Sequence, residues 1–554
     1  MNRQLAITEE DQLLSCAGDK PLQLNGHVYL PQPDRCHKLL VYYFDVCIAT
    51  YRLLHQPTIE SWLTIVSDND HHARPLSYGI GRAKTATVLA VLAIASFHEE
   101  KAQGPIAMPL ENGNPIASES DQLFSEASRL TNAETGFPRL ESAQCRLLQV
   151  LYLLMSCRFN QAWYTFGHAL QIISALGLYR RDNYKQAGSS YRRDYIEEQG
   201  RKRTFWVAYI LDKYLGTILG RPQHYHDEDV DQDLPCAIND EDMTSAGPRL
   251  TGSGDCLLES LVVHAKLAQI AEKISREVYS LKVVPDEARL AASHRLGAEL
   301  RQWRAALPPF LGAVDPSSLI PKFRRQATML KMSYCHAVML AHRPFLLKVK
   351  TRNSDVTQTL AKESVAECIA AARSVLNAVD RMESEGRLFH AFWWTHYICF
   401  CALVVLYVWA IQESSNTTTS EERQSMLDQA DRCLQHLAAA TASNSPSRRY
   451  SIILQELRNE AIRKTSRTVL EATATVGRPI EEHLVDGATS TFGPDATTEQ
   501  WHSMFDSSTD TATPGLQNLL DDWRTTDWLH IDSSAFGPFP EALNDTVDWM
   551  DDGV

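Results

Sequence analysis

Residues 140–235 read LESAQCRLLQVLYLLMSCRFNQAWYTFGHALQIISALGLYRRDNYKQAGSSYRRDYIEEQGRKRTFWVAYILDKYLGTILGRPQHYHDEDVDQDLP, and this stretch decides the fold. Its first part carries apolar side chains at spacings of three and four, at Leu147, Leu148, Leu151, Leu154 and Met155. Such spacing places them on one face of a helix. The pattern recurs over residues 162–176 and 205–210, with polar turns between. The stretch therefore predicts three amphipathic helices closed by an acidic loop.

Short motifs follow one another along these helices. They are Ala162-Trp163, Leu176-Gly177-Leu178, the run RTFWVAYILD over residues 203–212, and Gly220-Arg221-Pro222. In this order they resemble the middle homology region of fungal zinc-cluster transcription factors, a helical regulatory domain. The family pattern continues with an acidic loop ending in leucine-proline, as residues 227–235 do here, and with a histidine-arginine-proline corner, as at residues 342–344.

The resemblance assigns structural rather than catalytic roles to the residues that carry it. Arg203 and Asp212 lie nine positions apart on one predicted helix, so each is expected to pair with another element. A turn is expected at residues 220–222, and Pro344 is expected to end a helix whose last carbonyls Arg343 caps. The full set is Trp163, Gly177, Arg203, Phe205, Trp206, Asp212, Gly220, Arg221, Pro222, Asp229, Pro235, His342, Arg343 and Pro344.

The sequence predicts no catalytic, cofactor-binding or metal-binding residue. The acidic loop, with His224 and His226 beside it, could be a metal cage or a solvated loop, and it lacks the ligand order and central glycine of a calcium loop. A glycine-rich phosphate loop, a zinc-type histidine-glutamate helix and a nucleophile elbow are all missing from the sequence. These observations favour a protein that is not an enzyme.

The twelve cysteines do not form the DNA-reading module typical of the resembled family. No two have the two-residue gap that chelates zinc, and Cys16, Cys36 and Cys47 are too far apart for a six-cysteine cluster. We therefore expect no cofactor in this chain, with zinc only if a cluster precedes it. The alternatives are a gene model that lacks a first exon and a protein that lost its DNA-reading module, so DNA contact is expected to be indirect or through an absent N-terminus.

The most apolar run, residues 391–411, contains no Asp, Glu, Lys or Arg. Its length would span a bilayer. However, its aromatic residues are spread along it rather than gathered at its ends, which favours a buried core helix. Trp393, Trp394 and Tyr397 in this run could pack in the core or line a small-molecule pocket, and core packing is the favoured interpretation.

The C-terminal tail differs from the rest of the chain in charge. Residues 471–554 contain 17 acidic residues against Arg478 and Arg524, a net charge of −15, which leaves +1 for residues 1–470. Abundant Ser, Thr, Gly and Pro predict disorder. Aromatic residues stand among the acids, which is typical of activation segments that dock on coactivators, and an inert solubilising tail is the alternative. The aromatic residues are Trp501, Phe505, Trp523, Trp528 and Trp549.

The sequence thus predicts an all-α protein: a multi-helix layered regulatory domain with a disordered acidic C-terminal tail. The expected divisions are an N-terminal extension (1–30), the helical domain (31–413), a linker with short helices (414–470) and the tail (471–554). We expect a nuclear transcriptional regulator, an activator that contacts coactivators and not membranes. The alternative is a regulator that does not bind DNA but dimerises with or sequesters an intact zinc-cluster factor and senses a small molecule. A homodimer is a further expected assembly.

Overall fold

The computed structural model describes residue 19, residues 30–464 with gaps, and residue 528. The gaps are residues 103–109, 112–113, 116–117, 182–193, 250–254, 281, 283, 348–354, 386–391, 413–419, 441–449 and 451–452. Over these described parts the fold is all-α, as predicted from the sequence, and the strands are two short antiparallel pairs. These are β1 (Leu110–Glu111) with β2 (Asn114–Pro115), and β3 (Met243–Thr244) with β4 (Gly247–Pro248).

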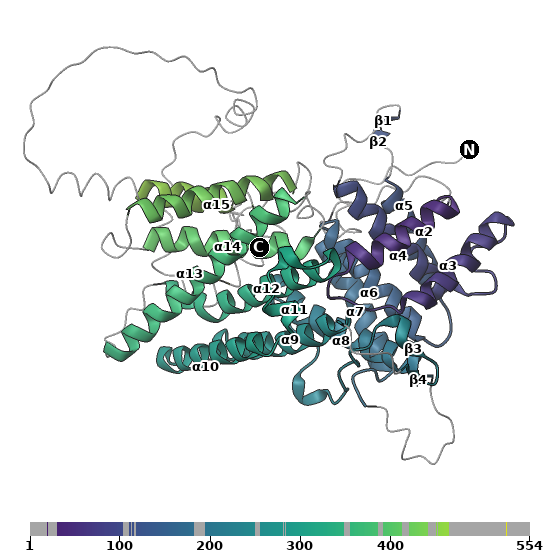
Figure 1. Cartoon of the computed structure of the whole chain (residues 1–554), viewed down its shortest axis with the longest axis horizontal. Coiled ribbons are helices and arrows are strands. Elements are labelled where there is room, and N and C mark those ends of the chain that lie inside the picture. The colour runs from purple at the N-terminus through teal and green to yellow at the C-terminus, as the bar shows by residue number, and fades with distance from the viewer. Residues whose placement is uncertain are drawn as a thin grey trace, which may run out of the picture.

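The first helices form one side of the molecule (Figure 1). They are α2 (Pro33–Tyr42), a π-helical turn η1 (Tyr43–Cys47), α3 (Gln56–His71), α4 (Arg82–Ala102) and α5 (Glu119–Asn132). Proline stands in the first turn of α2 and of α3, where a missing N–H costs nothing. The Ser118 hydroxyl accepts the Asp121 N–H at 3.2 Å and so caps α5. Helix α4 is buried along most of its length and packs against α5 and α6.

The three helices predicted from residues 140–235 are confirmed. They are α6 (Leu140–Met155), α7 (Phe159–Ala175) and α8 (Tyr195–Leu219). Gly177 and Gly220 follow α7 and α8 with φ of +61° and +60°, a left-handed conformation that glycine adopts without steric cost. One 3₁₀ turn, η3 (Asp227–Asp229), lies in the acidic loop, and a second, η4 (Asp240–Asp242), follows the loop.

The helices after α8 form the other side (Figure 1). They are α9 (Glu259–Val278), α10 (Asp286–Ala305), α11 (Pro309–Gly312), α12 (Pro321–His342), α13 (Asp355–Ser384), α14 (Trp393–Gln412) and α15 (Ser420–Ala440). Of these, α9 and α12 lie together with α8 where the two sides meet (Figure 1). Short 3₁₀ turns η5 (Pro316–Ser318) and η6 (Arg343–Leu346) flank α12. Because α9 contacts α8, α10 and α12, one hydrophobic core runs through both sides.

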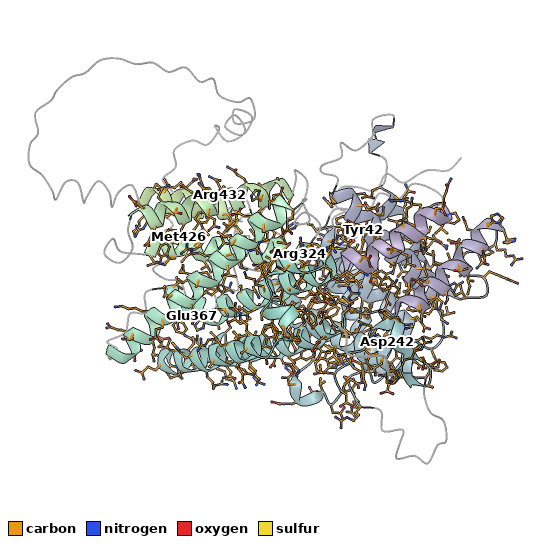
Figure 2. The ribbon with its side chains drawn as sticks, in the orientation of Figure 1. Tyr42, Asp242, Arg324, Glu367, Met426 and Arg432 are labelled. Carbon is orange, nitrogen blue, oxygen red and sulfur yellow. The ribbon has the colours of Figure 1, made fainter. Side chains whose placement is uncertain are left out.

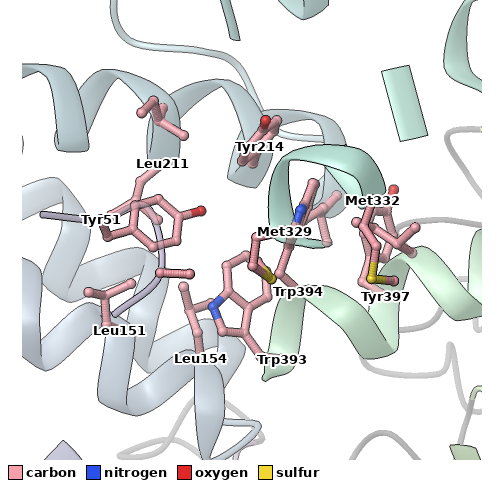
Figure 3. Packing of buried hydrophobic residues seen from close by; sticks show 14 of the residues in the cluster. Tyr51, Leu151, Leu154, Leu211, Tyr214, Met329, Met332, Trp393, Trp394 and Tyr397 are labelled. Carbon is pink, nitrogen blue, oxygen red and sulfur yellow. The ribbon is translucent and has the colours of Figure 1, made fainter. Parts of the chain in front are cut away.

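Helix α14 is the apolar run that raised the question of a membrane span. It is long and apolar enough to cross a bilayer, yet its hydrophobic window is entirely buried inside the protein. Trp394 and Tyr397 on α14 face Tyr214 of α8 and Met332 of α12 within the core (Figure 3). The burial agrees with the prediction of a core helix.

The folded unit continues past the boundary expected at residue 413. Helix α15 packs on α13 and α14, and Met426 and Arg432 lie on it (Figure 2). Residues 453–464 are also helical, and Leu454 and Leu457 belong to the same hydrophobic core. Arg458 forms a two-pronged ion pair with Asp431 of α15, with both N–O distances at 2.7 Å. The short helices expected within residues 414–470 therefore pack on the helical unit, at residues 420–440 and 453–464.

Candidate functional site

Arg203 fastens α8 to the start of α3. Its guanidinium is 1% exposed and donates to Asp240 Oδ1 at 2.7 Å and to the Leu54 carbonyl at 3.2 Å. Asp240 also accepts the backbone N–H of Gln56, the first residue of α3, at 2.8 Å. As predicted, Arg203 pairs with an element other than its own helix. The ion pair joins three segments that are distant in sequence.

Asp212 holds the chain that returns after α8. It is fully buried, and its two carboxylate oxygens accept the backbone N–H groups of His224 at 2.9 Å and Tyr225 at 3.0 Å. The neighbouring Lys213 ammonium, 1% exposed, lies 3.4 Å from the same carboxylate and donates to the Tyr225 carbonyl. Asp212 thus acts as a buried backbone clamp: its two backbone donors lie outside α8, whereas its charge partner Lys213 lies on α8.

The turn at Gly220-Arg221-Pro222 locks α7 against α8. The Arg221 guanidinium lies over the Trp163 ring, 5.2 Å from its centroid, and donates to Asn160 Oδ1 at 2.7 Å. Both of these partners lie on α7. Pro222 is exposed at the corner. The turn is a structural corner, as the sequence predicts.

The acidic loop is tied to the end of α7. The Asp231 carboxylate accepts the Arg181 N–H at 2.7 Å, and the Arg181 side chain pairs with Asp233 at 2.5 Å. The indole of Trp206, 3% exposed, donates to the Asp233 carbonyl at 2.9 Å. Asp229 remains exposed, whereas Phe205 and Pro235 are buried. The loop is therefore partly exposed to solvent and partly a strap, meaning a segment that joins Trp206 of α8 to the chain after α7. Among the described residues, no three His, Cys, Asp or Glu side chains are grouped as metal ligands.

The histidine-arginine-proline corner ends α12 at His342, as predicted for the residue two before Pro344. His342 Nδ1 lies 3.0 Å from the Ser293 hydroxyl of α10, and burial lowers the pKa of His342 to about 4. Arg343 Nε donates to the Tyr279 hydroxyl at 2.8 Å, and that hydroxyl donates to the Leu340 carbonyl at 2.8 Å. The sequence predicted that Arg343 caps the last carbonyls of α12. In the structure the Tyr279 hydroxyl donates to one of these carbonyls, and the Arg343 guanidinium orients Tyr279.

The aromatic cluster around α14 is packed as a core. Trp394 is 1% exposed, its Nε1–H donates to Ser333 Oγ at 2.9 Å, and its ring stacks on Tyr214 with centroids 4.2 Å apart. A cavity of about 40 Å³ is lined by Met155 and by Tyr51, Met329, Trp393 and Trp394. The last four are labelled in Figure 3. That volume suits about one or two water molecules, not a metabolite. Core packing is the interpretation that this geometry supports.

An aspartate from the N-terminal extension caps α7. Asp19 is 5% exposed; its carboxylate accepts the Gln161 N–H at 2.7 Å and the Asn160 side-chain amide at 3.4 Å. Burial raises the pKa of Asp19 to about 6, against the opposing effect of these hydrogen bonds and of Arg158. Arg221 is the other charged group near it. Nothing in the local sequence pattern marked Asp19, because its partners lie far along the chain.

The Asp19 contact is expected to weaken as the pH rises. A carboxyl group whose pKa is higher in the folded state stabilises that state fully below about pH 4, and this contribution is lost as the pH rises through about 6. Relative to Asp19→Asn, the wild-type chain should gain on the order of 1 kcal/mol in unfolding free energy between pH 7 and pH 5. Urea titrations at both pH values measure this difference. Asp34→Asn, on an exposed side chain, is the matched control, and an equal change in both variants would contradict the prediction.

The described residues define a large helical domain whose signature side chains clamp helices and turns together. Residues 40–305 match the family described as the fungal specific transcription factor domain. The match agrees, over those residues, with the resemblance stated from the motifs.

The similar proteins are fungal transcriptional regulators. "Activator of stress genes protein 1" of Candida albicans is 26% identical over 73% of this chain and 42% of its own length. "Activator of stress genes 1" of Saccharomyces cerevisiae is 25% identical over 77% of this chain and 44% of its own. The "ABC-transporter-regulating transcription factor" of Aspergillus fumigatus is 23% identical over 70% and 42%. The chain thus spans less than half of these relatives' lengths, and the family and its relatives are regulators of transcription, not enzymes.

Proposed function

We propose that this chain regulates transcription as a zinc-cluster-type factor, with a helical regulatory domain joined to an acidic activation tail. The observation that carries the proposal is the match of residues 40–305 to the transcription factor domain. The clamps at Arg203 and Asp212 support a structural role for these signature residues, since each of the two side chains holds one element against another. Relatives with the same domain carry the word activator in their names.

The tail is the proposed output of the protein. Aromatic residues placed among carboxylates are typical of segments that enter an apolar groove of a coactivator. A net charge of −15 over residues 471–554 also favours approach to a groove with a basic rim. Of the five proposed aromatic residues, Trp501, Phe505, Trp523 and Trp549 lie outside the described residues, and Trp528 lies within them.

Fusing residues 471–554 to an unrelated DNA-binding module should switch on a reporter gene by at least about tenfold, because the docking aromatics are then brought to a promoter. The matched control is the same fusion with Trp501, Trp523, Trp528 and Trp549 changed to alanine, which keeps the charge of the tail. That control should return the reporter to background. Equal activity from both fusions, at equal expression, would reduce the tail to a charged solubilising segment.

We propose that promoter contact is made by a zinc-cluster partner or by sequence outside residues 1–554, because this sequence holds no six-cysteine module. Such a protein acts in the nucleus. The second candidate is a regulator that holds an intact zinc-cluster factor away from DNA. Co-purification with such a factor distinguishes the two proposals. The complex should shift promoter DNA if the chain acts at the promoter, and should not bind promoter DNA if the chain holds the factor away from it.

A further inference from the structure

Trp528 is the residue of the acidic tail that the structure describes, and it lies inside the helical domain. Its side chain is 0% exposed and belongs to the same hydrophobic core as α12, α13 and α14. A solvated activation segment would leave this ring in water. The ring instead lies against Arg343, which precedes it by 185 positions in sequence.

The site that receives the ring is the histidine-arginine-proline corner. The Arg343 guanidinium, itself 2% exposed, lies 5.3 Å from the centroid of the Trp528 ring and 5.5 Å from that of Tyr279. The Arg343 Nε–H bond to the Tyr279 hydroxyl sets the orientation of the guanidinium. A cation over an aromatic face is attracted most strongly by tryptophan, and more so when both are desolvated. We call Tyr279 and Arg343 the indole socket.

The position of the socket on the helix adds to its affinity for a ring. Arg343 stands directly after the last residue of α12, where the backbone carbonyls give the helix a negative end that favours a buried cation. Replacing water over this guanidinium with an indole face keeps the charge compensated while removing apolar surface from solvent. Trp528 and the socket belong to one chain, so the encounter is intramolecular.

We infer that the indole socket captures Trp528 in cis, so that the acidic tail is anchored on the domain and Trp528 is withheld from other proteins while it is seated. The consequence for transcription rests on the proposed function, whereas the anchoring itself does not. Trp501, Trp523 and Trp549 stand in similar acidic surroundings in the sequence, so the assignment to Trp528 comes from the structure alone.

Trypsin tests the anchoring on the intact chain. Beyond residue 467 the sequence offers trypsin one site, the bond after Arg524, because Arg478 precedes a proline. A protease must draw several residues on both sides of the bond into its cleft, and a seated Trp528 lies four residues downstream. Release of residues 525–554, followed by mass spectrometry, is expected to be about tenfold faster for Trp528→Ala than for the wild type.

Two further variants separate this effect from general loosening. Trp549→Ala, an equal truncation elsewhere in the tail, should release the peptide at the wild-type rate. Arg343→Lys keeps the charge but loses the planar face and the Nε–H bond to Tyr279. It should speed release as Trp528→Ala does, by more than any change in the urea midpoint of the domain accounts for. Equal release from wild type and Trp528→Ala would overturn the anchoring, as would an equal acceleration by Trp549→Ala.

A reporter assay then tests the regulatory consequence. The full chain fused to a DNA-binding module should give several-fold higher reporter activity with Arg343→Lys than without it, because the socket no longer holds the tail. If Arg343→Lys speeds peptide release but leaves reporter activity unchanged, the anchoring in the wild type stands, and its role in withholding the tail is overturned. Failure of the isolated tail to activate would instead count against the proposed function.

Discussion

Replacing Asp212 with alanine is expected to lower the free energy of unfolding by about 3–5 kcal/mol. The loss comes from two sources. The Lys213 ammonium, 1% exposed, would lose the carboxylate 3.4 Å away and remain as a buried charge. The N–H groups of His224 and Tyr225 would lose the acceptors that now lie 2.9 and 3.0 Å away, and an unsatisfied buried donor costs about 1–3 kcal/mol.

Two variants make the Asp212 result specific. Asp212→Asn keeps an acceptor oxygen but not the charge, so it should fall between alanine and wild type. Asp229→Asn, on an exposed side chain of the same acidic region, should change stability by less than about 0.5 kcal/mol. Urea unfolding followed by circular dichroism provides the comparison. A loss no larger for Asp212→Ala than for Asp229→Asn would show that the buried clamp contributes little.

Replacing Trp394 with alanine is expected to cost about 3–5 kcal/mol, as for other large-to-small changes in a core. The indole stacks on Tyr214 at 4.2 Å and contacts the His336 ring at 5.1 Å, so its removal opens a void between α8, α12 and α14. The Ser333 hydroxyl would also lose the N–H donor now 2.9 Å away. The expected readout is a lower urea midpoint with the helical signal at zero urea retained.

Added indole should partly restore the Trp394→Ala variant, because an apolar cavity of this origin binds small aromatic molecules. Tyr164→Ala is the control, since that ring is 63% exposed on α7 and should tolerate truncation. A midpoint for Trp394→Ala equal to that of Tyr164→Ala would contradict the core role of α14. Such a result would reopen the idea that the Trp393 and Trp394 region is a ligand pocket.

Much of the local structure was readable in the sequence. Apolar spacing predicted α6, α7 and α8, and the glycines at 177 and 220 marked two helix ends. The nine-residue separation of Arg203 and Asp212 was enough to predict that each pairs outside α8. These inferences succeed because helix periodicity, capping and turns depend on residues within a few positions of one another.

The identity of the partners was not readable in the same way. Asp240 for Arg203, Tyr279 for Arg343 and Asp19 for the start of α7 are separated from their partners by long stretches of chain. The packing of α15 was not readable either, because polar residues interrupt the pattern before it and its apolar face finds its core on α13 and α14. A change in composition along the chain is a local feature, whereas the limits of a domain depend on which distant segments contact one another.

The sequence by itself determined that this protein is helical, that residues 140–235 carry the family signature, and that residues 471–554 are strongly acidic. The tertiary contacts were needed to learn that the acidic loop is a strap and that Trp528 meets Arg343, and they agree with the core interpretation that the sequence already favoured for α14. The reason is physical: spacing along the chain decides which side chains share a helix face, but burial and ion pairing depend on which faces meet across the core.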